Sequence, residues 1–478
     1  MRSPMPTVGV LVLCLFLAAC SAIQPLAPVS PTDRVAAPNV PGDPLAGGVL
    51  LLQYLSDGGP LTLHRIDPAT GEPYDGYAPI QLAPRSLLSV PHVVSPSGRY
   101  IAVVAGQRQS CEPYAGGGAC RAAAETLYLI DAASWTILHS IDLEGNGWTK
   151  PLAFDASDTR FAMALHMRDT ERILLFDVPS GSRLAEAPVT IRPSFLSFVP
   201  GASVLVAYGP QLGSEPGITQ PEPPRVVALD GETLRPKWER ILPDVIDGDW
   251  CTANCTASHE ERQFAYLRPA VIMAPDGSKL YVIHAESDRL STVSLSDGAA
   301  HSLTIRPVLS WVETLLALTA KTASAKGAME LATRTATIAP DGSQLYVATH
   351  YDRMAGVTGS TTELRRSHLQ RIESNTGQIA AEAELAGDVM ALTLDGTRLL
   401  LYGWSEQGAW AELRTAADLA VETRASGWLV SASASPRSLL LASRSARGQS
   451  EVAVLDPATL SPIHTWQLDG YVQLLELP

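Results

Sequence analysis

The chain has 478 residues, of which 46% are hydrophobic and 18% are charged, and its formal net charge is −14. This composition supports a large folded core and is unlike that of a disordered chain. The acidic excess argues against a nucleic-acid partner, because phosphates are bound through Lys and Arg, and against adhesion to anionic lipid by charge alone.

The N-terminal segment predicts export. Arg2 is followed by an apolar run from Val8 to Leu17 and then by Leu17-Ala18-Ala19-Cys20. The run is shorter than the ~20 apolar residues of a membrane span, so residues 1–19 read as a signal peptide. The stretch "LAAC" resembles the bacterial lipobox. That resemblance implies cleavage before Cys20, acylation of Cys20 (for example with palmitate) and a lipid anchor on the extracytoplasmic side, at the cell surface or in the periplasm.

Residues 20–47 predict a tether. After Cys20 this segment has little apolar surface to bury and carries six prolines, namely Pro25, Pro28, Pro31, Pro38, Pro41 and Pro44. A proline-rich segment of this kind is an extended, semi-rigid spacer. We therefore expect a single folded domain, residues 48–478, held away from the bilayer.

A repeated motif indicates the fold. "APDGSKLYV" begins at Ala274 and recurs as "APDGSQLYV" from Ala339. A Pro-Asp-Gly turn followed by an alternating apolar strand is typical of a β-hairpin. Weaker copies begin near residues 95, 155, 199, 393 and 435. Most copies are followed by a further strand that ends in a turn cluster, as in "TLYLIDAAS".

Units of about 45–60 residues with this pattern predict an all-β fold, a β-propeller. The C-terminal stretch from Tyr471, "YVQLLELP", supplies a first strand that the N-terminal unit lacks, so we expect the two ends to pair and close the ring. Eight blades are predicted, with seven as the alternative if the degenerate unit near Arg398 is miscounted. The predicted second strands start near Val49, Arg99, Arg160, Val204, Lys279, Gln344, Arg398 and Ser438.

The "PDGSKLYV" spelling resembles the YVTN family of bacterial, WD-repeat-like propellers, and the resemblance covers most of residues 48–478. It identifies a blade and implies no particular chemistry. One unit also resembles the quinoprotein blade motif A-x-D-x-x-T-G-x-x-x-W. It matches at Ala228, Asp230, Thr233 and Trp238, whereas Leu234 stands where the motif has Gly.

Loop lengths point to one face of the ring. Turns between first and second strands, and between third and fourth strands, are short. Five long insertions fall instead in the connections that emerge on the opposite face. They span residues 106–124, 209–224, 242–267, 306–331 and 350–366. Long loops on a rigid scaffold are where binding usually occurs, so this face is the predicted site.

Two insertions contain cysteine pairs, Cys111 with Cys120 and Cys251 with Cys255. In an oxidising exported compartment we expect each pair to form a disulfide that stiffens its loop. A zinc site is the alternative, but neither pair is accompanied by a His or a second Cys pair at zinc spacing.

The insertion from residue 242 also carries Asp244, Asp247 and Asp249 beside Trp250. These carboxylates form either a calcium site or an ordinary solvated loop, and no other cofactor is indicated. Trp250 either anchors a partner or packs against its own loop. A short helix around Trp311, with a capping box at Ser310 and Glu313, either packs on the rim or docks a partner.

Three histidines, His166, His284 and His350, end second strands near the long loops. Asp169, Glu286, Asp288, Asp352 and Arg353 follow them and could supply acid–base partners or metal ligands. The chain has no G-x-S-x-G, H-E-x-x-H or P-loop motif, so no catalytic residue is assigned.

Three functions remain open, with enzymatic activity the less favoured. The first is a membrane-anchored binding or scaffold module that recognises a protein, glycan or envelope partner through the long-loop face. The second is a lactonase-like hydrolase, which some YVTN-like propellers are. The third is an accessory lipoprotein of envelope assembly. Converging carboxylates and histidines would favour the second, and an exposed apolar surface would favour the first or third.

Overall fold

The computed structural model describes residues 49–475 apart from sixteen stretches, and all structural statements below concern the described residues. The stretches left out are 55–59, 68–71, 75–76, 85–89, 109–121, 144–147, 168–169, 213–221, 254–262, 308–328, 356–360, 395, 406, 432–439, 447–448 and 457. The described elements are all β-strands, and they form eight sheets.

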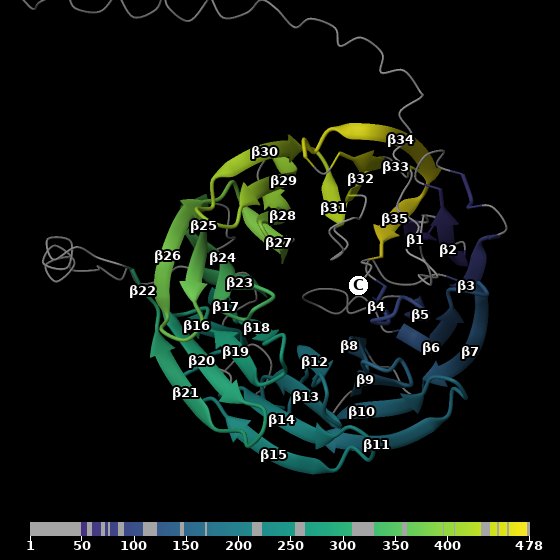
Figure 1. Ribbon diagram of the computed structural model, residues 1–478, viewed down its shortest axis with the longest axis horizontal. Coiled ribbons are helices and arrows are strands. Elements are labelled where there is room, and N and C mark those ends of the chain that lie inside the picture. The colour runs from purple at the N-terminus through teal and green to yellow at the C-terminus, as the bar shows by residue number, and fades with distance from the viewer. Residues whose placement is uncertain are drawn as a thin grey trace, which may run out of the picture. The chain divides into compact units, whose positions relative to one another are not determined.

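Each sheet contains a four-stranded antiparallel blade, and the blades follow one another around a ring in chain order (Figure 1). We number them 1 to 8. Blade 1 contains β35 (Tyr471–Leu474), β1 (Val49–Tyr54), β2 (Pro60–Ile66) and β3 (Ile80–Pro84). Blade 2 contains β4 (His92–Val94), β5 (Tyr100–Arg108), β6 (Ala122–Asp131) and β7 (Thr136–Leu143). Blade 3 contains β8 (Trp148–Phe154), β9 (Arg160–Met167), β10 (Thr170–Asp177) and β11 (Arg183–Val189). Blade 4 contains β12 (Phe195–Phe198), β13 (Val204–Gly209), β14 (Arg225–Asp230) and β15 (Pro236–Ile241).

The second half of the chain repeats the arrangement with additions to one blade. Blade 5 contains β18 (Ala270–Met273), β19 (Lys279–Ile283), β20 (Arg289–Ser294) and β21 (Ala300–Thr304). Blade 6 contains β23 (Met329–Ile338), β24 (Gln344–Ala355), β25 (Thr361–Glu373) and β26 (Gln378–Glu384), and its sheet is widened to seven strands by β16 (Gly248–Ala253), β17 (Gln263–Arg268) and β22 (Arg306–Pro307). Blade 7 contains β27 (Asp388–Leu394), β28 (Arg398–Ser405), β29 (Gly408–Thr415) and β30 (Val421–Ser426). Blade 8 contains β31 (Leu429–Ser431), β32 (Leu440–Ala446), β33 (Gln449–Leu455) and β34 (Pro462–Asp469).

The two ends of the domain close the ring as the sequence predicts. The C-terminal strand β35 pairs antiparallel with β1, with Leu51 opposite Leu474, and so becomes the innermost strand of the N-terminal blade. Gln473 then links this strand to the next blade, because its side chain accepts a hydrogen bond from the Val90 amide at 3.0 Å and donates one to the Val90 carbonyl at 3.2 Å. The propeller fold and its closure by strand exchange are confirmed.

The core is divided among the gaps between blades. Alternate residues of a strand point to opposite faces of its sheet, so each blade contributes one apolar row to each neighbour. Eight clusters of buried residues fill the eight gaps, including the one between blades 8 and 1, and a ninth lies beneath the added strands of blade 6. Eight sheets and eight gaps agree with the larger of the two predicted blade counts.

The repeated motif forms the turn between first and second strands. In the copy from Ala274, the Asp276 carboxylate accepts hydrogen bonds from the amide and the hydroxyl of Ser278, at 2.9 and 2.7 Å. Gly277 takes a left-handed conformation with φ +68°, which glycine adopts without strain. The copy from Ala339 makes the same bonds. The nine residues therefore recur because they satisfy a turn that each blade needs.

The turn between third and fourth strands explains why Leu234 departs from the quinoprotein motif. Leu234 takes φ +55° and is 1% exposed, because its side chain enters the core between blades 3 and 4. Burying a leucine side chain stabilises by about 1.5–3 kcal/mol, which offsets the ~1–2 kcal/mol that a left-handed conformation costs a residue with a Cβ. Three other blades place large apolar residues at this position in the same way, namely Trp135, Leu419 and Leu460.

Several sequence predictions fall on residues that the structure does not describe. The signal peptide, Cys20 and the tether are among them, as are Cys111, Cys120, Cys255 and the segment around Trp311. Within the residues that it does describe, no helix has the length and apolar character to cross a bilayer.

Candidate functional site

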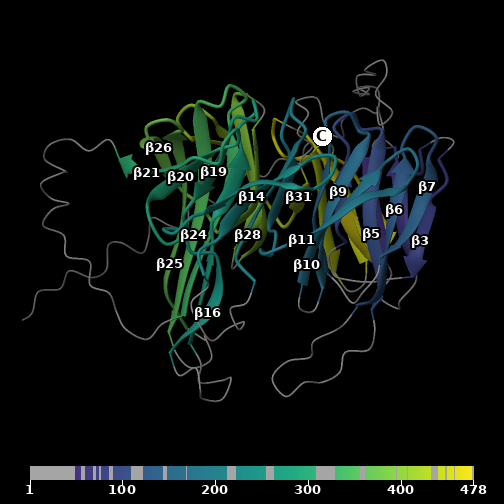
Figure 2. The same cartoon turned by 90° about the horizontal axis from the view of Figure 1, so that it is seen from below.

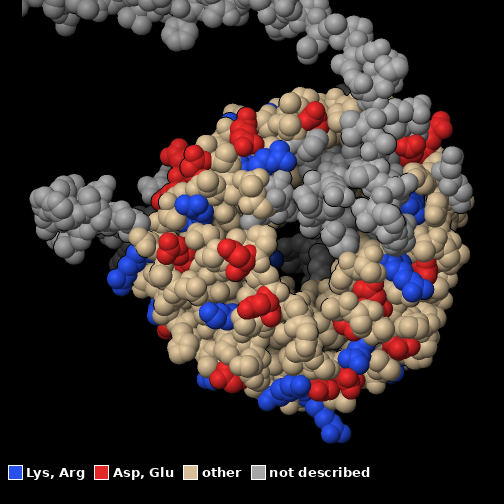
Figure 3. Space-filling model, viewed as in Figure 1, with Lys and Arg blue, Asp and Glu red and all other residues tan. Residues whose placement is uncertain are grey.

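The long insertions all leave the ring on one face, which we call the long-loop face. Three of them connect second to third strands, in blades 2, 4 and 6, and two connect one blade to the next. The opposite, tight-turn face carries the short hairpin turns. Figure 3 shows that face, and charged residues of both signs are scattered over it without gathering into one patch.

The most prominent element of the long-loop face is an extension of blade 6. Strands β24 and β25 have 12 and 13 residues, whereas their counterparts β19 and β20 in blade 5 have 5 and 6. The hairpin β16–β17 joins this extension through parallel pairing of β17 with β23, where Ala265 lies opposite Glu330. Figure 2 shows β16, β24 and β25 projecting beyond the ends of the other blades. We call these strands, with the start of β23, the platform.

The platform is fixed to the ring by its own small core. Trp250 from β16 packs with Leu267 of β17, Ala332 of β23 and Tyr351 of β24, and against Ala285, which follows β19 in blade 5. The contact shows Trp250 as a partly buried anchor of the hairpin within the chain. The sequence allowed Trp250 either to anchor a partner or to pack within the chain. In the structure it packs within the chain, against Leu267, Ala285 and Ala332.

A buried polar group lies where the platform meets blades 4 and 5. Asp247, which directly precedes β16, is 5% exposed and interacts with Arg268, with the Tyr208 hydroxyl and with Glu286. Burial raises the pKa of Asp247 to about 6, opposed by the Arg268 charge and reinforced by the Glu286 charge. Burial beside Asp247 also raises the pKa of Tyr208 well above its ordinary value. The Tyr208 contact is weaker than a regular hydrogen bond, because this hydroxyl reaches no described acceptor at hydrogen-bonding geometry.

His284 belongs to a second polar group on blade 5. Its side chain is fully buried, and its Nε2 lies 2.8 Å from the Ser291 hydroxyl while its Nδ1 lies 3.3 Å from the Glu286 carboxylate. With the proton on Nδ1, the imidazole donates to Glu286 and accepts from Ser291. This is the order of a nucleophile–base–carboxylate set. Ser291 is 3% exposed, however, and also hydrogen-bonds Ser302 at 3.0 Å within the sheet.

The neighbouring charges form ion pairs rather than a metal site. Arg289 pairs with Asp244 at 3.0 Å, and the buried Arg334 of β23 pairs with Asp288 at 3.4 Å. Among the described residues, no three His, Cys, Asp or Glu side chains converge to hold a metal ion. Asp244 and Asp247 face different partners, and the Asp249 side chain lies outside the described part of the chain. The calcium alternative therefore stays a prediction.

The three histidines do not converge. His350 pairs with Thr333 across β24 and β23, on the face of blade 6 that meets blade 7, and its Nδ1 lies 2.7 Å from the Ser367 hydroxyl. His284 lies on the other side of blade 6, in blade 5. His166, in blade 3, pairs with the buried Glu171, which Arg192 also approaches at 3.5 Å. Burial is the main reason that the pKa of Glu171 is raised.

The sequence located this face but missed several of its residues. Trp250, Asp244, Asp247, His284 and His350 lie at the end of the ring that carries the long insertions, and Asp247, His284 and His350 are buried there. Asp352 and Arg353 are placed only as backbone positions of β24. Tyr208, Arg268, Ser291, Arg334 and Glu171 were not predicted. A single polar side chain inside an apolar strand, such as Tyr208 in "VLVAYG", was the available signal, and Arg334 is the one charged residue in "LATRTATI".

Comparisons with known proteins support the fold. No protein-family model matches the chain, and no curated protein matches it. Among solved structures, the chain is similar to dihydro-heme d1 dehydrogenase NirN in complex with DHE, with a TM-score of 0.55 at 14% identity, covering 92% of this chain and 77% of that one.

Two weaker similarities complete the comparison. A putative 6-phosphogluconolactonase from Bacteroides uniformis has a TM-score of 0.38 at 14% identity, over 90% of this chain and 100% of that one. BamB from Moraxella catarrhalis has a TM-score of 0.33 at 10% identity, over 74% of this chain and 95% of that one. At these identities the similarities concern the propeller fold alone.

Proposed function

We propose that this protein is a binding module that recognises a protein partner through the platform on its long-loop face. The observation that carries the proposal is the seven-stranded sheet of blade 6. The β16–β17 hairpin and the extended ends of β24 and β25 come from different parts of the chain and form one projecting surface. The ring closes without either of them. Long elements held rigidly on one face of a scaffold are typical of binding sites.

Strand edges give the platform a way to bind. Strand β26 pairs with β25 only from His368 onward, so the first half of β25, from Thr361, has no neighbour on that side among the described strands. Strand β16 likewise pairs only with β17 within the described part of the sheet. An extended partner segment could add to either edge through main-chain hydrogen bonds, which is a recurrent mode of peptide recognition.

Site-directed photo-cross-linking in the producing cells tests this proposal. A photoreactive residue is placed at Thr361 or Thr362 on β25, and at Asp276 or Asp341 on the tight-turn face as matched controls. We expect a discrete cross-linked product from the β25 positions only. Products of equal yield from both faces, or from the tight-turn face alone, would contradict the proposal, as would the absence of any product from β25.

Deleting the extension provides a second test. Residues 352–365 are replaced by Asn-Gly, a sequence that favours a two-residue hairpin turn. The cross-linked product or co-purified partner should be lost. The melting temperature of the ring should change little, because the described cores between blades contain no residue from 352–365. Retention of the partner would rule out β24 and β25 as the contact.

The proposed location follows from the N-terminal sequence. Acylation at Cys20 and the tether would place the domain outside the cytoplasm, beside a membrane, so the partner would be an envelope or surface protein. Replacing Cys20 by Ser should move the protein from the membrane fraction to the soluble fraction. An unchanged distribution would remove this part of the proposal.

Hydrolysis is a second candidate, favoured by one observation, the Ser291–His284–Glu286 set. Its burial opposes the idea, because a substrate cannot reach a nucleophile that is 3% exposed without an opening of the blade. A fluorophosphonate probe that labels reactive serines distinguishes the two roles. Labelling that disappears in Ser291→Ala supports the hydrolase, and no labelling assigns the three residues to structure.

A further inference from the structure

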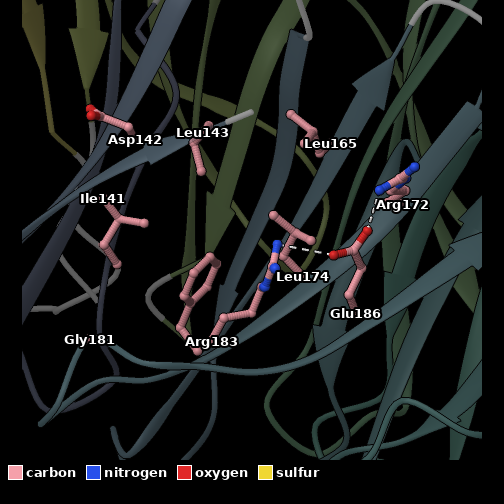
Figure 4. A pocket seen from close by; sticks show the side chains of 10 residues that line it. Ile141, Asp142, Leu143, Leu165, Arg172, Leu174, Gly181, Arg183 and Glu186 are labelled. Carbon is pink, nitrogen blue, oxygen red and sulfur yellow. Dashed lines mark hydrogen bonds and ion pairs between the residues drawn. The ribbon is translucent and has the colours of Figure 1, made fainter. Parts of the chain in front are cut away.

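A second candidate site lies away from the platform, on the outer side of blades 2 and 3. A cavity of about 240 Å³ separates their outer strands. Apolar side chains line its interior, with Ile141 and Leu143 from β7 and Leu165 and Leu174 from β9 and β10 (Figure 4). Phe176 of β10 also lines it. Protein interiors are close-packed, so an apolar gap of this size is unusual.

The third-to-fourth-strand turn of blade 3 accounts for the gap. Four blades fill the space toward the preceding blade with a large side chain at the left-handed position of this turn, as Leu234 does in blade 4. Blades 3, 5 and 6 have a left-handed glycine there instead, and Gly181 of blade 3, with φ +66°, lines the cavity. A Cβ on Gly181 would lie 2.4 Å from the His139 ring, so His139 occupies the place where a larger residue would enter. The buried cluster between blades 2 and 3 thus receives no side chain from this turn, and the cavity lies beside Gly181.

Charged side chains stand at one side of the cavity. Glu186 lies opposite Leu174 and Arg183 lies opposite Phe176 in the pairing of β10 with β11, which puts the charges on the same sheet face as the apolar lining. Glu186 binds Arg183 at 3.0 Å and also binds Arg172 through its other oxygen (Figure 4). Asp142, on the facing strand, accepts a hydrogen bond from Thr126 at 3.1 Å.

The two arginines keep donors for a ligand. Each guanidinium has five N–H donors, and each uses one nitrogen on Glu186. The side chains of Arg172 and Arg183 are 40% and 51% exposed. The two arginines share the Glu186 carboxylate, while Asp142 on the facing strand accepts from Thr126, so the arginines retain N–H groups that can bind a further anion. A planar fork of donors is suited to a second carboxylate.

We propose that this cavity binds a short amphiphilic carboxylate. Its hydrocarbon part would fill the gap that Gly181 leaves, and its carboxylate would bind Arg183 and Arg172 in competition with Glu186. The cavity is smaller than the roughly 300–1,000 Å³ of drug-sized ligand sites, so it suits a chain of about eight carbons. Glu186 thus holds the arginines in place in the absence of ligand and limits the affinity.

Calorimetric titration of the full chain carrying Cys20→Ser tests the proposal without detergent that would compete for the cavity. The probe is octanoate. Octylammonium has the same chain with the opposite charge, and acetate has the same head without the chain. We expect octanoate to bind with a Kd below about 1 mM and each control to bind at least about tenfold more weakly. Equal binding of octanoate and octylammonium would overturn the proposal, as would no octanoate binding in the millimolar range.

Three variants assign the binding to this cavity. Glu186→Gln removes the competing charge and should tighten octanoate binding by about tenfold, whereas Arg183→Gln should weaken it by a similar factor. Ile141→Trp should fill the cavity and abolish binding. If Ile141→Trp fails to fold, the opposite changes in octanoate affinity of Glu186→Gln and Arg183→Gln still show whether octanoate binds at this cavity. Octanoate binding that none of these substitutions changes would place the ligand elsewhere and overturn the assignment.

Discussion

The two faces of the ring treat carboxyl groups in opposite ways. On the tight-turn face, hydrogen bonds lower the pKa of aspartates in the hairpin turns, as the Thr233 hydroxyl and amide do for Asp230, whose pKa is about 2. Asp276, Asp297, Asp341 and Asp418 share this direction. On the long-loop face, burial raises the pKa of Asp247 to about 6 and also raises that of Glu171.

The difference follows from how each face is built. A tight turn points free backbone amides at one short side chain, and a carboxylate that accepts them is stabilised in its charged form. On the long-loop face, inserted strands cover polar groups that would otherwise be hydrated, and the charged form is destabilised. On the tight-turn face, charged carboxylates therefore stabilise the turns. On the long-loop face, where binding is proposed, the charged form of a buried carboxyl group is destabilised.

The largest expected effect concerns the buried left-handed residue of the tight-turn face. Leu234→Ala should lower the free energy of unfolding by about 4 kcal/mol, because it removes a buried side chain and leaves the backbone strain. Leu234→Gly should cost about 1 kcal/mol less, because glycine relieves the strain. Urea unfolding of the three proteins measures both differences. A glycine variant less stable than the alanine variant would show that the strain is negligible.

Substituting two glycines of one hairpin, one at each face, compares how much room the two faces leave for a side chain. A Cβ on Gly209, at the long-loop end of β13, would lie 1.9 Å from the Arg192 carbonyl oxygen, whereas a Cβ on Gly201, in the tight turn, would meet nothing within 4 Å. Gly209→Ala should destabilise by about 3 kcal/mol, since backbone must move. Gly201→Ala should cost about 1 kcal/mol, from its left-handed conformation alone. Thermal unfolding of both variants checks the order, and similar losses would contradict it.

A smaller effect than those of Leu234→Ala and Gly209→Ala is expected in the pH dependence of stability. The pKa of Asp247 is raised by folding, so its proton is lost more easily from the unfolded chain, and its contribution to stability falls as pH rises from about 4 to about 6. Asp247→Asn should therefore gain about 2 kcal/mol over the wild type between pH 4 and pH 7.

Asp230→Asn is the matched control on the other face. The pKa of Asp230 is lowered by folding, so its stabilising contribution is present above the ordinary value of 3.8 and is lost as pH falls toward 2. The two variants should differ from the wild type in opposite pH directions. Unfolding measured from pH 2 to pH 8 tests this, and parallel curves for the wild type and Asp247→Asn would show that Asp247 titrates normally.

Most of the fold could be predicted because it rests on local patterns. Predicted second strands near Arg160, Val204, Lys279 and Gln344 begin where β9, β13, β19 and β24 begin. Alternation of apolar residues and turn chemistry act over a few residues, so they can be read from the sequence. Leu234 marks the limit of this reading, since its left-handed conformation depends on the blade that its side chain enters.

The candidate sites could be predicted only in part. The loop lengths indicated the face, and "LPDVIDGDW" drew attention to Asp247. Nothing local indicated that Tyr208, from the preceding blade, and Glu286, from the following one, would meet Asp247. The same holds for the cavity between blades 2 and 3, because its lining combines Ile141 and Leu143 of one blade with Leu174 and Arg183 of the next.

The sequence by itself determined an all-β propeller, the turns that repeat around it, the pairing of its two ends and the face that carries the long insertions. These features depend on short-range periodicity and on which connections are long. Only the tertiary structure shows that β16 and β17 join blade 6, that the histidines lie apart and that a cavity lies between blades 2 and 3. Each of these is a contact between residues distant in the chain, set by packing across neighbouring blades rather than by local preference.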